Sequence, residues 1–429
     1  MNSRYNVRLL EASALPDLEV EIARIETYSS AVPRMLAKAA WLVLRADNIP
    51  AHSAMVLKQL LLANGGDAQI SPDVYLGRPE AETTPALLFC TQRGYSAVLS
   101  AMRALPLDDI RQLAGEIEQA LHGALPRDRG SLQAGSLRMV WGERTYVMGI
   151  INVTPDSFSR DGLLARGDEL RALVAEQARR FAAEGADMLD IGGESTRPGA
   201  EPVRVEEELR RVIPAIEAAR QAVDLPISID TYKADVAARA LDAGAAIVND
   251  IWGLRTPDGN WNESLARLVA ERDVPVILMH NRWARATVGA LGGHYSDAHY
   301  DDLLGEICAE LRASVAYAEA QGIAPERIIV DPGIGFGKTP RQNIELLRRM
   351  SELRSLGLPI LLGASRKSFI GLALGLPPEE RASGTAATTA LGIAAGADII
   401  RVHDVALNVQ VARMVDAIVR PGAWERIAG

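Results

Sequence analysis

The sequence contains very little cysteine and no long apolar segment. Cys90 and Cys308 are the two cysteines among 429 residues, and they have neither paired spacing nor the spacing of a metal site. We therefore expect both to be reduced thiols. The first 20 residues lack the continuous apolar region of a signal peptide, and no uncharged run approaches the roughly 18 residues that span a bilayer. These absences predict a cytoplasmic protein without a membrane segment.

An excess of positive charge is also missing. The formal net charge is −9 and the isoelectric point is near 5.4, which argues against a nucleic-acid binder that relies on a basic surface. The stretch GIGFGK at 333–338 lacks the spacing of a P-loop, so we reject an ATPase. No nucleophile–base pair of acyl transfer and no histidine–cysteine cluster for zinc or iron stands out. With 48% hydrophobic and 24% charged residues, the composition is that of a globular protein.

The length of the chain predicts two domains, because 429 residues exceed one ordinary core. Residues 123–138, GALPRDRGSLQAGSLR, have no hydrophobic period, and we interpret residues 126–143 as a linker. Residues 1–125 then form a small α/β domain of unknown role, for which we favour oligomer contact or stabilisation over a second catalytic centre. Its apolar patterns predict strands at 5–11 and 85–90 and helices at 32–44, 52–66 and 108–123.

The second domain, residues 144–429, repeats a short apolar run followed by an amphipathic helical stretch. Near-continuous apolar strands separated by helices are typical of a parallel sheet covered by helices. Eight such runs match a (β/α)₈ TIM barrel. A doubly wound open sheet is the alternative, but it often has a phosphate-binding glycine turn where this chain has NVTPDSFS. The predicted strands are 146–152, 187–191, 225–230, 245–250, 274–280, 327–331, 358–363 and 397–402.

Most of these runs end in polar residues. In a barrel, the C-terminal ends of the strands converge on one face, where active sites are built. A single Asp or Asn at such a position is often only a helix cap, but seven or more strand ends with mixed charge predict a site. The residues are Asn152, Asp190, Asp230, Asn249, His280, Asp331, Ser365, Arg366, Lys367, Arg401 and His403.

Four basic residues predict that one side of this site binds phosphate. Arg401 and His403 are two residues apart at a strand end, so they point the same way. Two such groups on a core element need an anionic partner. With Lys367 and Arg197, they suit the oxygens of a diphosphate.

The remaining groups predict a ring and a metal ion. Asp230, Asn249 and Asp331 supply acceptors and an amide, which complement a flat heterocycle with amino and N–H groups. Asn152 is a neutral oxygen ligand that suits Mg²⁺, because this ion keeps waters and substrate phosphates in its coordination shell.

Seven motifs, in order over residues 145–420, resemble those of dihydropteroate synthase. They are MGIINVTPDSFS (148–159), DIGGESTRPGA (190–200), SIDTYK (228–233), IVNDI (247–251), DPGIGFGK (331–338), GASRKSFIG (363–371) and RVHDV (401–405). The resemblance implies a transferase of folate biosynthesis that requires Mg²⁺. In the reaction it implies, p-aminobenzoate displaces the diphosphate of 6-hydroxymethyl-7,8-dihydropterin in an SN1-like step and gives 7,8-dihydropteroate.

The resemblance also implies a role for each matching residue. Lys367, Arg401, His403 and Arg197 would act in catalysis. The pterin ring would be held by Asp230, Asn249, Asp331 and Lys367, the diphosphate by Arg401 and His403, and Mg²⁺ by Asn152. Thr196 and Arg197 would close over the site, and Pro198, Phe336 and Ser368 would surround p-aminobenzoate.

Two departures from the family pattern and two alternative functions stay open. Arg160 interrupts the common DSFSDGG, and Asn281 stands where Met is frequent. A pterin-dependent methyltransferase shares the barrel but binds no diphosphate, so the basic residues disfavour it. A non-catalytic pterin-binding protein would be expected to have lost diphosphate or Mg²⁺ residues. Because the family pairs through late helices, we expect a homodimer that uses the helix at 405–419.

Overall fold

The computed structural model describes residues 18–19, 22, 32–78, 82–124, 130–154, 168–195, 200–289, 294–420 and 422–428. Contacts divide the chain into two units, Met1–Leu121 and His122–Gly429. This division differs from the predicted boundaries, because part of the expected linker, 126–143, is a hairpin that belongs to the second unit. None of the described helices combines the length and apolar character needed to cross a membrane.

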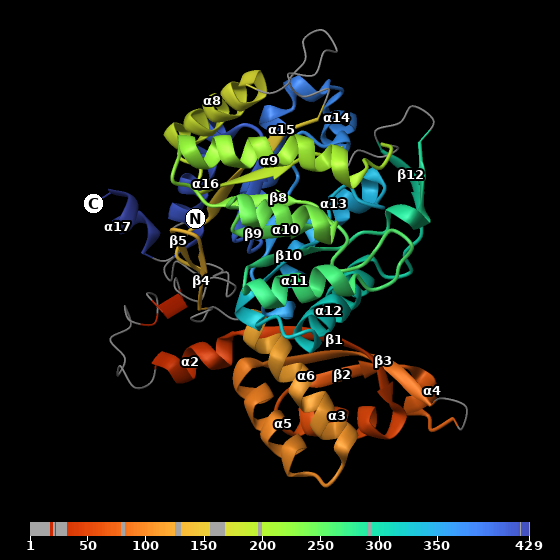
Figure 1. The fold of residues 1–429 in the computed structure, drawn as a ribbon. Coiled ribbons are helices and arrows are strands. Elements are labelled where there is room, and N and C mark those ends of the chain that lie inside the picture. The colour runs from red at the N-terminus through yellow and green to blue at the C-terminus, as the bar shows by residue number, and fades with distance from the viewer. Residues whose placement is uncertain are drawn as a thin grey trace. The chain divides into compact units, whose positions relative to one another are not determined.

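The second unit is built around an eight-stranded parallel sheet ringed by helices (Figure 1). Neighbouring strands follow the order β13-β10-β9-β8-β7-β6-β15-β14, and a parallel bridge between Val330 and Ile360 closes the sheet. The predicted barrel is therefore confirmed: each strand falls inside its predicted range, apart from one extra residue at the end of β7, although several begin two or three residues later than predicted. The strands are β6 (Tyr146–Asn152), β7 (Met188–Gly192), β8 (Ile227–Asp230), β9 (Ile247–Asp250), β10 (Val276–Met279), β13 (Ile328–Asp331), β14 (Leu361–Leu362) and β15 (Ile399–Val402).

The helices cover the barrel with their apolar faces, and their ends are encoded locally. In α13, the Thr339 side chain accepts from the Gln342 amide while the Gln342 side chain accepts from Thr339, with Pro340 at the first position. The helices are α8 (Asp168–Glu184), α9 (Val205–Ala222), α10 (Ala234–Ala243), α11 (Glu263–Arg272), α12 (Leu303–Ala320), α13 (Pro340–Arg348), α14 (Ser368–Leu374), α15 (Ala382–Ala394), α16 (Val405–Val419) and α17 (Ala423–Ala428). Shorter elements are η2 (Trp283–Arg285), β11 (Ala286–Val288), β12 (Tyr295–Ala298), η3 (Pro325–Arg327), η4 (Met350–Leu356) and η5 (Pro378–Glu380).

A hairpin closes the N-terminal end of the barrel. Strands β4 (Ser131–Ala134) and β5 (Leu137–Val140) pair antiparallel. Their buried Leu132 and Met139 belong to one cluster with Met148, Met188 and Ile277, which lie near the starts of barrel strands. The bottom of the barrel is thus filled by apolar side chains, and polar chemistry is left to the opposite end.

The first unit is a three-stranded antiparallel sheet with helices. Strands β1 (Trp41–Pro50), β3 (Thr83–Thr91) and β2 (Asp67–Ile70) lie in that order. The predicted helix at 32–44 is wrong beyond residue 39, because the alternating apolar run that starts at Trp41 pairs with β3. The predicted strand at 5–11 lies outside the described residues, whereas the other three expected elements are present. The helices are α2 (Val32–Ala39), α3 (Ala51–Ala63), α4 (Pro72–Tyr75), α5 (Gln92–Ala104) and α6 (Asp108–Ala124).

Candidate active site

The C-terminal ends of neighbouring barrel strands bring the predicted polar residues together. Asp190 lies in β7, Asp230 ends β8 and Asn249 lies in β9, and these three strands are adjacent. Parallel register places Asp230 directly beside Asn249. Arg401 in β15 reaches both acidic residues, so side chains far apart in the sequence meet in one cluster.

Arg401 is held between two carboxylates. Its Nε donates to Asp190 Oδ2 at 2.5 Å, and its NH2 donates to Asp230 Oδ2 at 2.6 Å. Asp190 is fully buried, and the side chain of Arg401 is 19% exposed. The sequence assigned the anionic partner of Arg401 to a phosphate group, whereas the protein itself supplies two carboxylates. Asp190, for which the sequence predicted no role, is therefore part of the cluster; its position at a strand end was the available signal.

Burial and charge set the protonation of this cluster. Burial lowers the pKa of Arg401, but the charges of Asp190 and Asp230 outweigh this effect and raise the pKa above its ordinary value. The guanidinium therefore stays protonated. Burial raises the pKa of Asp230 to about 7. The charge of Arg401 opposes this rise, and the charge of Asp190 adds to it. Asn249 donates its amide to the carboxylate of Asp190 at 3.3 Å. One guanidinium thus balances more than one buried carboxyl group, which leaves Asp230 free to change protonation near neutral pH.

Lys367 lies beside a loop that follows β13. Its Nζ donates to the Ile334 carbonyl and sits 4.3 Å from the centre of the Phe336 ring. Burial lowers the pKa of Lys367 to about 8, although the charge of Asp331 opposes this. Asp331 accepts the Gly333 amide at 2.7 Å, and burial raises the pKa of its carboxyl group. Lys367, Asp331 and Phe336, which the sequence predicted for one site, do lie together.

His403 contacts Ser365, which lies in the loop that follows β14. Its Nδ1 lies 3.0 Å from Ser365 Oγ, and its backbone amide donates to the same oxygen at 3.1 Å. Arg366 instead pairs with Asp404, with Nε donating to Oδ2 at 2.9 Å. Ser365, another residue without a predicted role, therefore orients the imidazole, and the Arg366–Asp404 ion pair joins the loops that follow β14 and β15.

The other predicted site residues fall into three groups. Asn152 ends β6 between β7 and β15, and its side-chain amide makes no hydrogen bond within the described part of the chain. Ser368 is the first residue of α14 and is partly exposed. Thr196, Arg197 and Pro198 lie outside the described residues.

The two departures from the expected motifs have different outcomes. Arg160 lies outside the described residues. Asn281 donates to the Ile251 carbonyl at 3.0 Å and accepts the Trp283 amide at 2.8 Å. It therefore fixes the turn that follows β10, and the rings of Trp252 and Trp283 stack there with centroids 6.2 Å apart.

The donor set around Asn152 can be compared with what metal ions require. Among the described residues, no three His, Cys, Asp or Glu side chains gather to bind a metal ion, so zinc-type coordination has no support there. The side-chain oxygen of Asn152, a single neutral ligand that has no hydrogen-bond partner among the described residues, does fit Mg²⁺, which takes few protein ligands and fills its shell with waters and phosphate oxygens.

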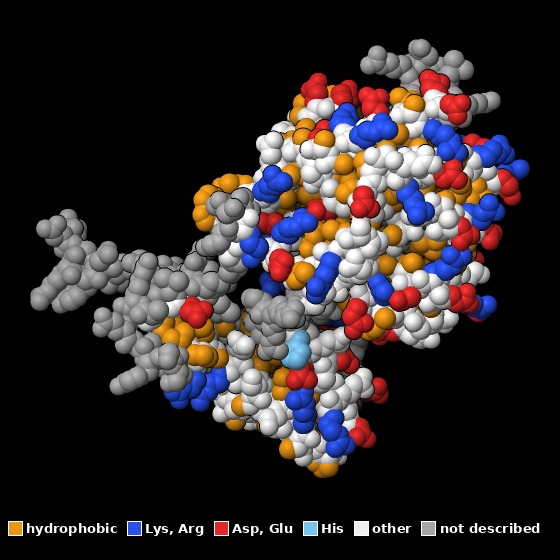
Figure 2. Space-filling view, turned by 60° about the vertical axis from the view of Figure 1, so that its left-hand side comes forward, with side chains coloured by type: hydrophobic (Ala, Val, Ile, Leu, Met, Phe, Trp, Pro, Cys, Tyr) orange, Lys and Arg blue, Asp and Glu red, His pale blue; other side chains and the backbone are white. Residues whose placement is uncertain are grey.

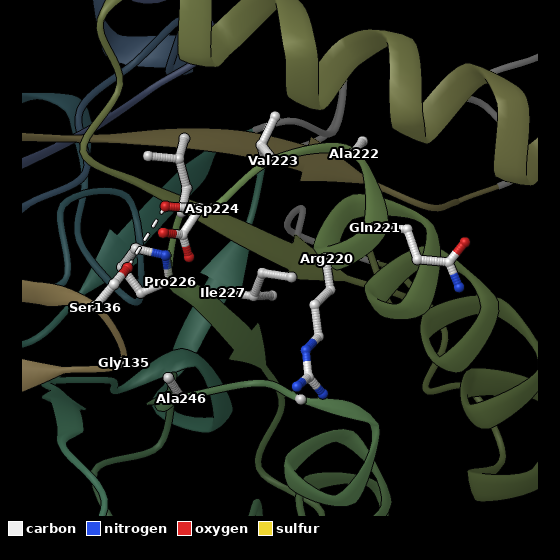
Figure 3. Close-up of a pocket in the computed structure, with 12 residues that line it drawn as sticks. Gly135, Ser136, Arg220, Gln221, Ala222, Val223, Asp224, Pro226, Ile227 and Ala246 are labelled. Atoms are coloured by element: carbon white, nitrogen blue, oxygen red, sulfur yellow. Dashed lines mark hydrogen bonds between the residues drawn. The ribbon is translucent and has the colours of Figure 1, made fainter.

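A pocket at the other end of the barrel is separate from this site. It is lined by Ser136 of the hairpin turn, Arg220, Asp224 and the residues that lead into β8 and β9 (Figure 3). Because it lies at the starts of the strands, none of the polar strand ends reaches it. The face of the molecule in Figure 2 carries lysine and arginine interspersed with acidic side chains, so that face offers no extended basic surface.

Comparisons with known proteins agree on one family. Residues 148–403 match the family described as "Pterin binding enzyme". The chain is 48% identical over 292 residues to the dihydropteroate synthase of Synechocystis sp., covering 67% of this chain and 95% of that one. The structure of Xanthomonas albilineans dihydropteroate synthase with 4-aminobenzoic acid matches with 42% identity and a TM-score of 0.60, covering 68% of this chain and 98% of that one.

A further relative also matches the first unit. The probable bifunctional folylpolyglutamate synthase/dihydropteroate synthase of Halobacterium salinarum is 38% identical over 415 residues, which cover 96% of this chain and 47% of that protein. The likeness to the Synechocystis enzyme, by contrast, covers only two thirds of this chain.

Proposed function

Because the chain belongs to the pterin-binding enzymes and, within them, to the dihydropteroate synthases, we propose that the strand ends described above carry out its reaction. In that reaction, p-aminobenzoate displaces the diphosphate of 6-hydroxymethyl-7,8-dihydropterin and gives 7,8-dihydropteroate. The observation that carries the residue assignment is the guanidinium of Arg401, held between Asp190 and Asp230 at the mouth of the barrel.

On the pterin side, Asp230, Asn249, Asp331 and Lys367 bind the ring. When the C–O bond breaks, positive charge develops on the pterin methylene and spreads into the ring. The buried carboxyl groups of Asp230 and Asp331 favour that charge, since their ionised forms are poorly solvated and gain from a nearby cation. The step is SN1-like, so the protein contributes position and electrostatics rather than a covalent intermediate.

On the diphosphate side, Arg401 and His403 receive the leaving oxygens together with Arg197. Two of the five N–H donors of Arg401 bond the carboxylates, which fix the plane of the guanidinium and leave the other donors for the diphosphate. Asn152 would hold Mg²⁺, which supplies neutralising charge to the diphosphate when bound. The attacking aniline is a free base at neutral pH, so the site needs no strong general base.

The p-aminobenzoate lies near Phe336, Ser368 and Pro198 in this proposal, with Thr196 and Arg197 closing over it. The structure of the Xanthomonas albilineans relative with 4-aminobenzoic acid supports this choice of second substrate. The basic residues argue against the two alternatives, a methyltransferase that binds methyl-folate and a non-catalytic pterin-binding protein.

The proposed assembly is a cytoplasmic homodimer. Free, buried Cys90 and Cys308 support a reducing compartment. The late helices α15 and α16 expose large apolar side chains, including Leu391 at 66%, Met414 at 62% and Ile418 at 69%, which support pairing through these helices. In sedimentation experiments we expect the wild type to be a dimer and the Ile418→Glu variant to be a monomer. A monomeric wild type would contradict the proposed dimer.

The reaction is tested with purified protein, dihydropterin diphosphate, p-aminobenzoate and Mg²⁺. We expect stoichiometric release of diphosphate and formation of 7,8-dihydropteroate by mass spectrometry, with loss of turnover in EDTA and recovery on addition of Mg²⁺. Binding of the pterin without turnover would favour the non-catalytic alternative. Methyl transfer from a methyl-folate to a corrinoid protein would favour the methyltransferase.

A further inference from the structure

Lys338 is a buried lysine that the proposed chemistry does not use. It is 1% exposed and follows the loop 332–337, between β13 and α13. Its Nζ lies 2.9 Å from the Gly333 carbonyl, 3.1 Å from the Phe336 carbonyl and 2.9 Å from His280 Nδ1. Burying an amine is costly unless its donors are satisfied, and here two of the three partners are carbonyls of the loop itself.

His280 anchors this lysine to the end of β10. Its backbone amide donates to the Asp331 carbonyl at 2.9 Å, and its Nε2 lies 3.0 Å from Glu310 Oε2 without the alignment of a hydrogen bond. Burial and the neighbouring charge of Lys338 lower the pKa of His280 to about 4, so the imidazole is neutral at physiological pH and can accept through Nδ1. Lys338 and His280 therefore join the strand end to the loop.

The loop depends on such support because glycine makes its backbone unusual. Gly333, Gly335 and Gly337 all have positive φ, at 69°, 80° and 62°. Glycine adopts this region without steric cost but loses more conformational freedom on folding than other residues. Added β-carbons would also collide: at Gly333 with the His280 carbonyl at 1.9 Å, and at Gly337 with the Arg282 backbone at 2.4 Å. The loop thus packs closely on the segment that follows β10.

The same loop carries both groups that contact Lys367 from this side, the Ile334 carbonyl and the Phe336 ring. Lys338 bonds the carbonyls at residues 333 and 336, which bracket Ile334. We propose that Lys338, held by His280, is a positioning residue that keeps Ile334 and Phe336 on the ammonium of Lys367. The assignment rests on the proposed function in one respect, namely that Lys367 and Phe336 touch the substrates.

Steady-state kinetics of four variants test the proposal. Lys338→Met removes the amine and its three hydrogen bonds but keeps an apolar stem of four atoms, and His280→Phe removes only the acceptor. His280→Asn retains an acceptor near the position of Nδ1 and is the conservative comparison. Lys58→Met is the matched control, since Lys58 is a partly buried lysine of the first unit that bonds the Ala68 carbonyl at 2.6 Å.

We expect Lys338→Met and His280→Phe to lower kcat/KM for p-aminobenzoate by about ten- to a hundredfold, because a displacement of about 1 Å at reacting groups can cost that much. His280→Asn recovers most of the loss, and Lys58→Met stays within about twofold of the wild type. A thermal melt of each protein accompanies the kinetics. Variants that melt at lower temperature but have wild-type kcat and KM when folded would show a structural role only and overturn the proposal.

The pKa of Lys367 gives a second readout that needs no turnover. Competitive acetylation against pH, followed by mass spectrometry, reports this pKa in the intact protein. Asp331, Asp230 and Arg401 act on Lys367, Lys367 and Lys338 repel each other, and burial holds the pKa of Lys367 down. Release of the loop admits water, so we expect the pKa to rise from about 8 toward the ordinary value of about 10.4 in both Lys338→Met and His280→Phe.

The two variants separate loop release from loss of charge, because His280→Phe keeps the amine of Lys338. An unchanged Lys367 pKa in both variants would overturn the proposal. Should the wild type fail to turn over, the proposed function fails, while the labelling result still decides whether Lys338 positions Lys367.

Discussion

Replacement of Arg401 by methionine tests the acidic cluster and the diphosphate role together. Arg401→Met keeps the aliphatic stem but leaves Asp190, fully buried, and Asp230, 9% exposed, without their guanidinium. Removing one partner of a buried ion pair typically costs about 3–5 kcal/mol of unfolding free energy. Removing a donor aimed at developing negative charge typically costs about 3–4 kcal/mol of barrier, or roughly a hundred- to a thousandfold in turnover.

The pH dependence of the stability loss follows from the carboxyl groups left behind. Burial already raises the pKa of Asp230 to about 7, above the unfolded value of about 3.9, and loss of Arg401 removes the group that opposes this rise. A carboxyl group whose pKa is higher in the folded than in the unfolded protein destabilises the fold at pH values above the unfolded pKa. This penalty disappears as the pH falls to the unfolded pKa. Below about pH 7 Asp230 is protonated in both folded proteins, so the deficit of Arg401→Met should be constant between pH 5 and 7 and should grow as the pH rises from about 7 to 9.

Urea denaturation at pH 5 to 9 and diphosphate release measure the two effects. The matched control is Arg144→Met at the other end of the barrel, where Arg144 pairs with Asp187 at 2.9 and 2.5 Å but is 46% exposed. We expect the control to lose less than about 1 kcal/mol and to keep turnover within about twofold. Near-normal turnover of folded Arg401→Met, or a stability deficit that is no larger at pH 9 than at pH 6, would refute the reasoning.

Three further predictions concern the fold. Asp250→Asn loses one of the two hydrogen bonds that the Asp250 carboxylate accepts from backbone amides, which should cost about 1–3 kcal/mol of unfolding free energy in urea denaturation. Burial raises the pKa of Asp250 to about 7, so the wild type loses stability as the pH rises from 4 to 7. The variant lacks this titrating group, and its deficit relative to the wild type should therefore shrink over that range. Gly333→Ala should unfold far more readily than Gly357→Ala, which has a similar φ but nothing within 4 Å of the added carbon; equal melting temperatures would contradict this. A chain that begins at His122 should fold and keep turnover within about threefold, since the first unit has its own core; loss of turnover in a folded barrel would give the first unit a catalytic role.

The barrel strands could be predicted because each is a short apolar run with a polar end, a pattern that survives without tertiary information. The hairpin at 131–140 could not, because its strands have only four residues each, on either side of the Gly135–Ser136 turn, and their apolar side chains are buried only against the barrel. The predicted helix at 32–44 ran too far for a related reason: the apolar residues after Ala39 fit either period, and pairing with β3 decided between them.

The composition of the site could be predicted, but its pairing could not. Arg401 and Asp190 are 211 residues apart, and a strand-end position does not tell which carboxylate a guanidinium will meet. Lys338 illustrates the same limit. A lysine in a glycine-rich loop is expected to be exposed, and nothing in the sequence indicates its buried partners at residues 280, 333 and 336.

The most direct measurement is a crystal structure of the protein with Mg²⁺ and a non-hydrolysable analogue of dihydropterin diphosphate. We expect diphosphate oxygens to lie at hydrogen-bond distance, about 2.7–3.2 Å, from the N–H groups of Arg401 that bond neither Asp190 nor Asp230, with the ring against Asp230 and Asn249. A ligand whose diphosphate points away from Arg401 and His403, or one bound in the pocket beside Ser136 and Arg220, would contradict this expectation.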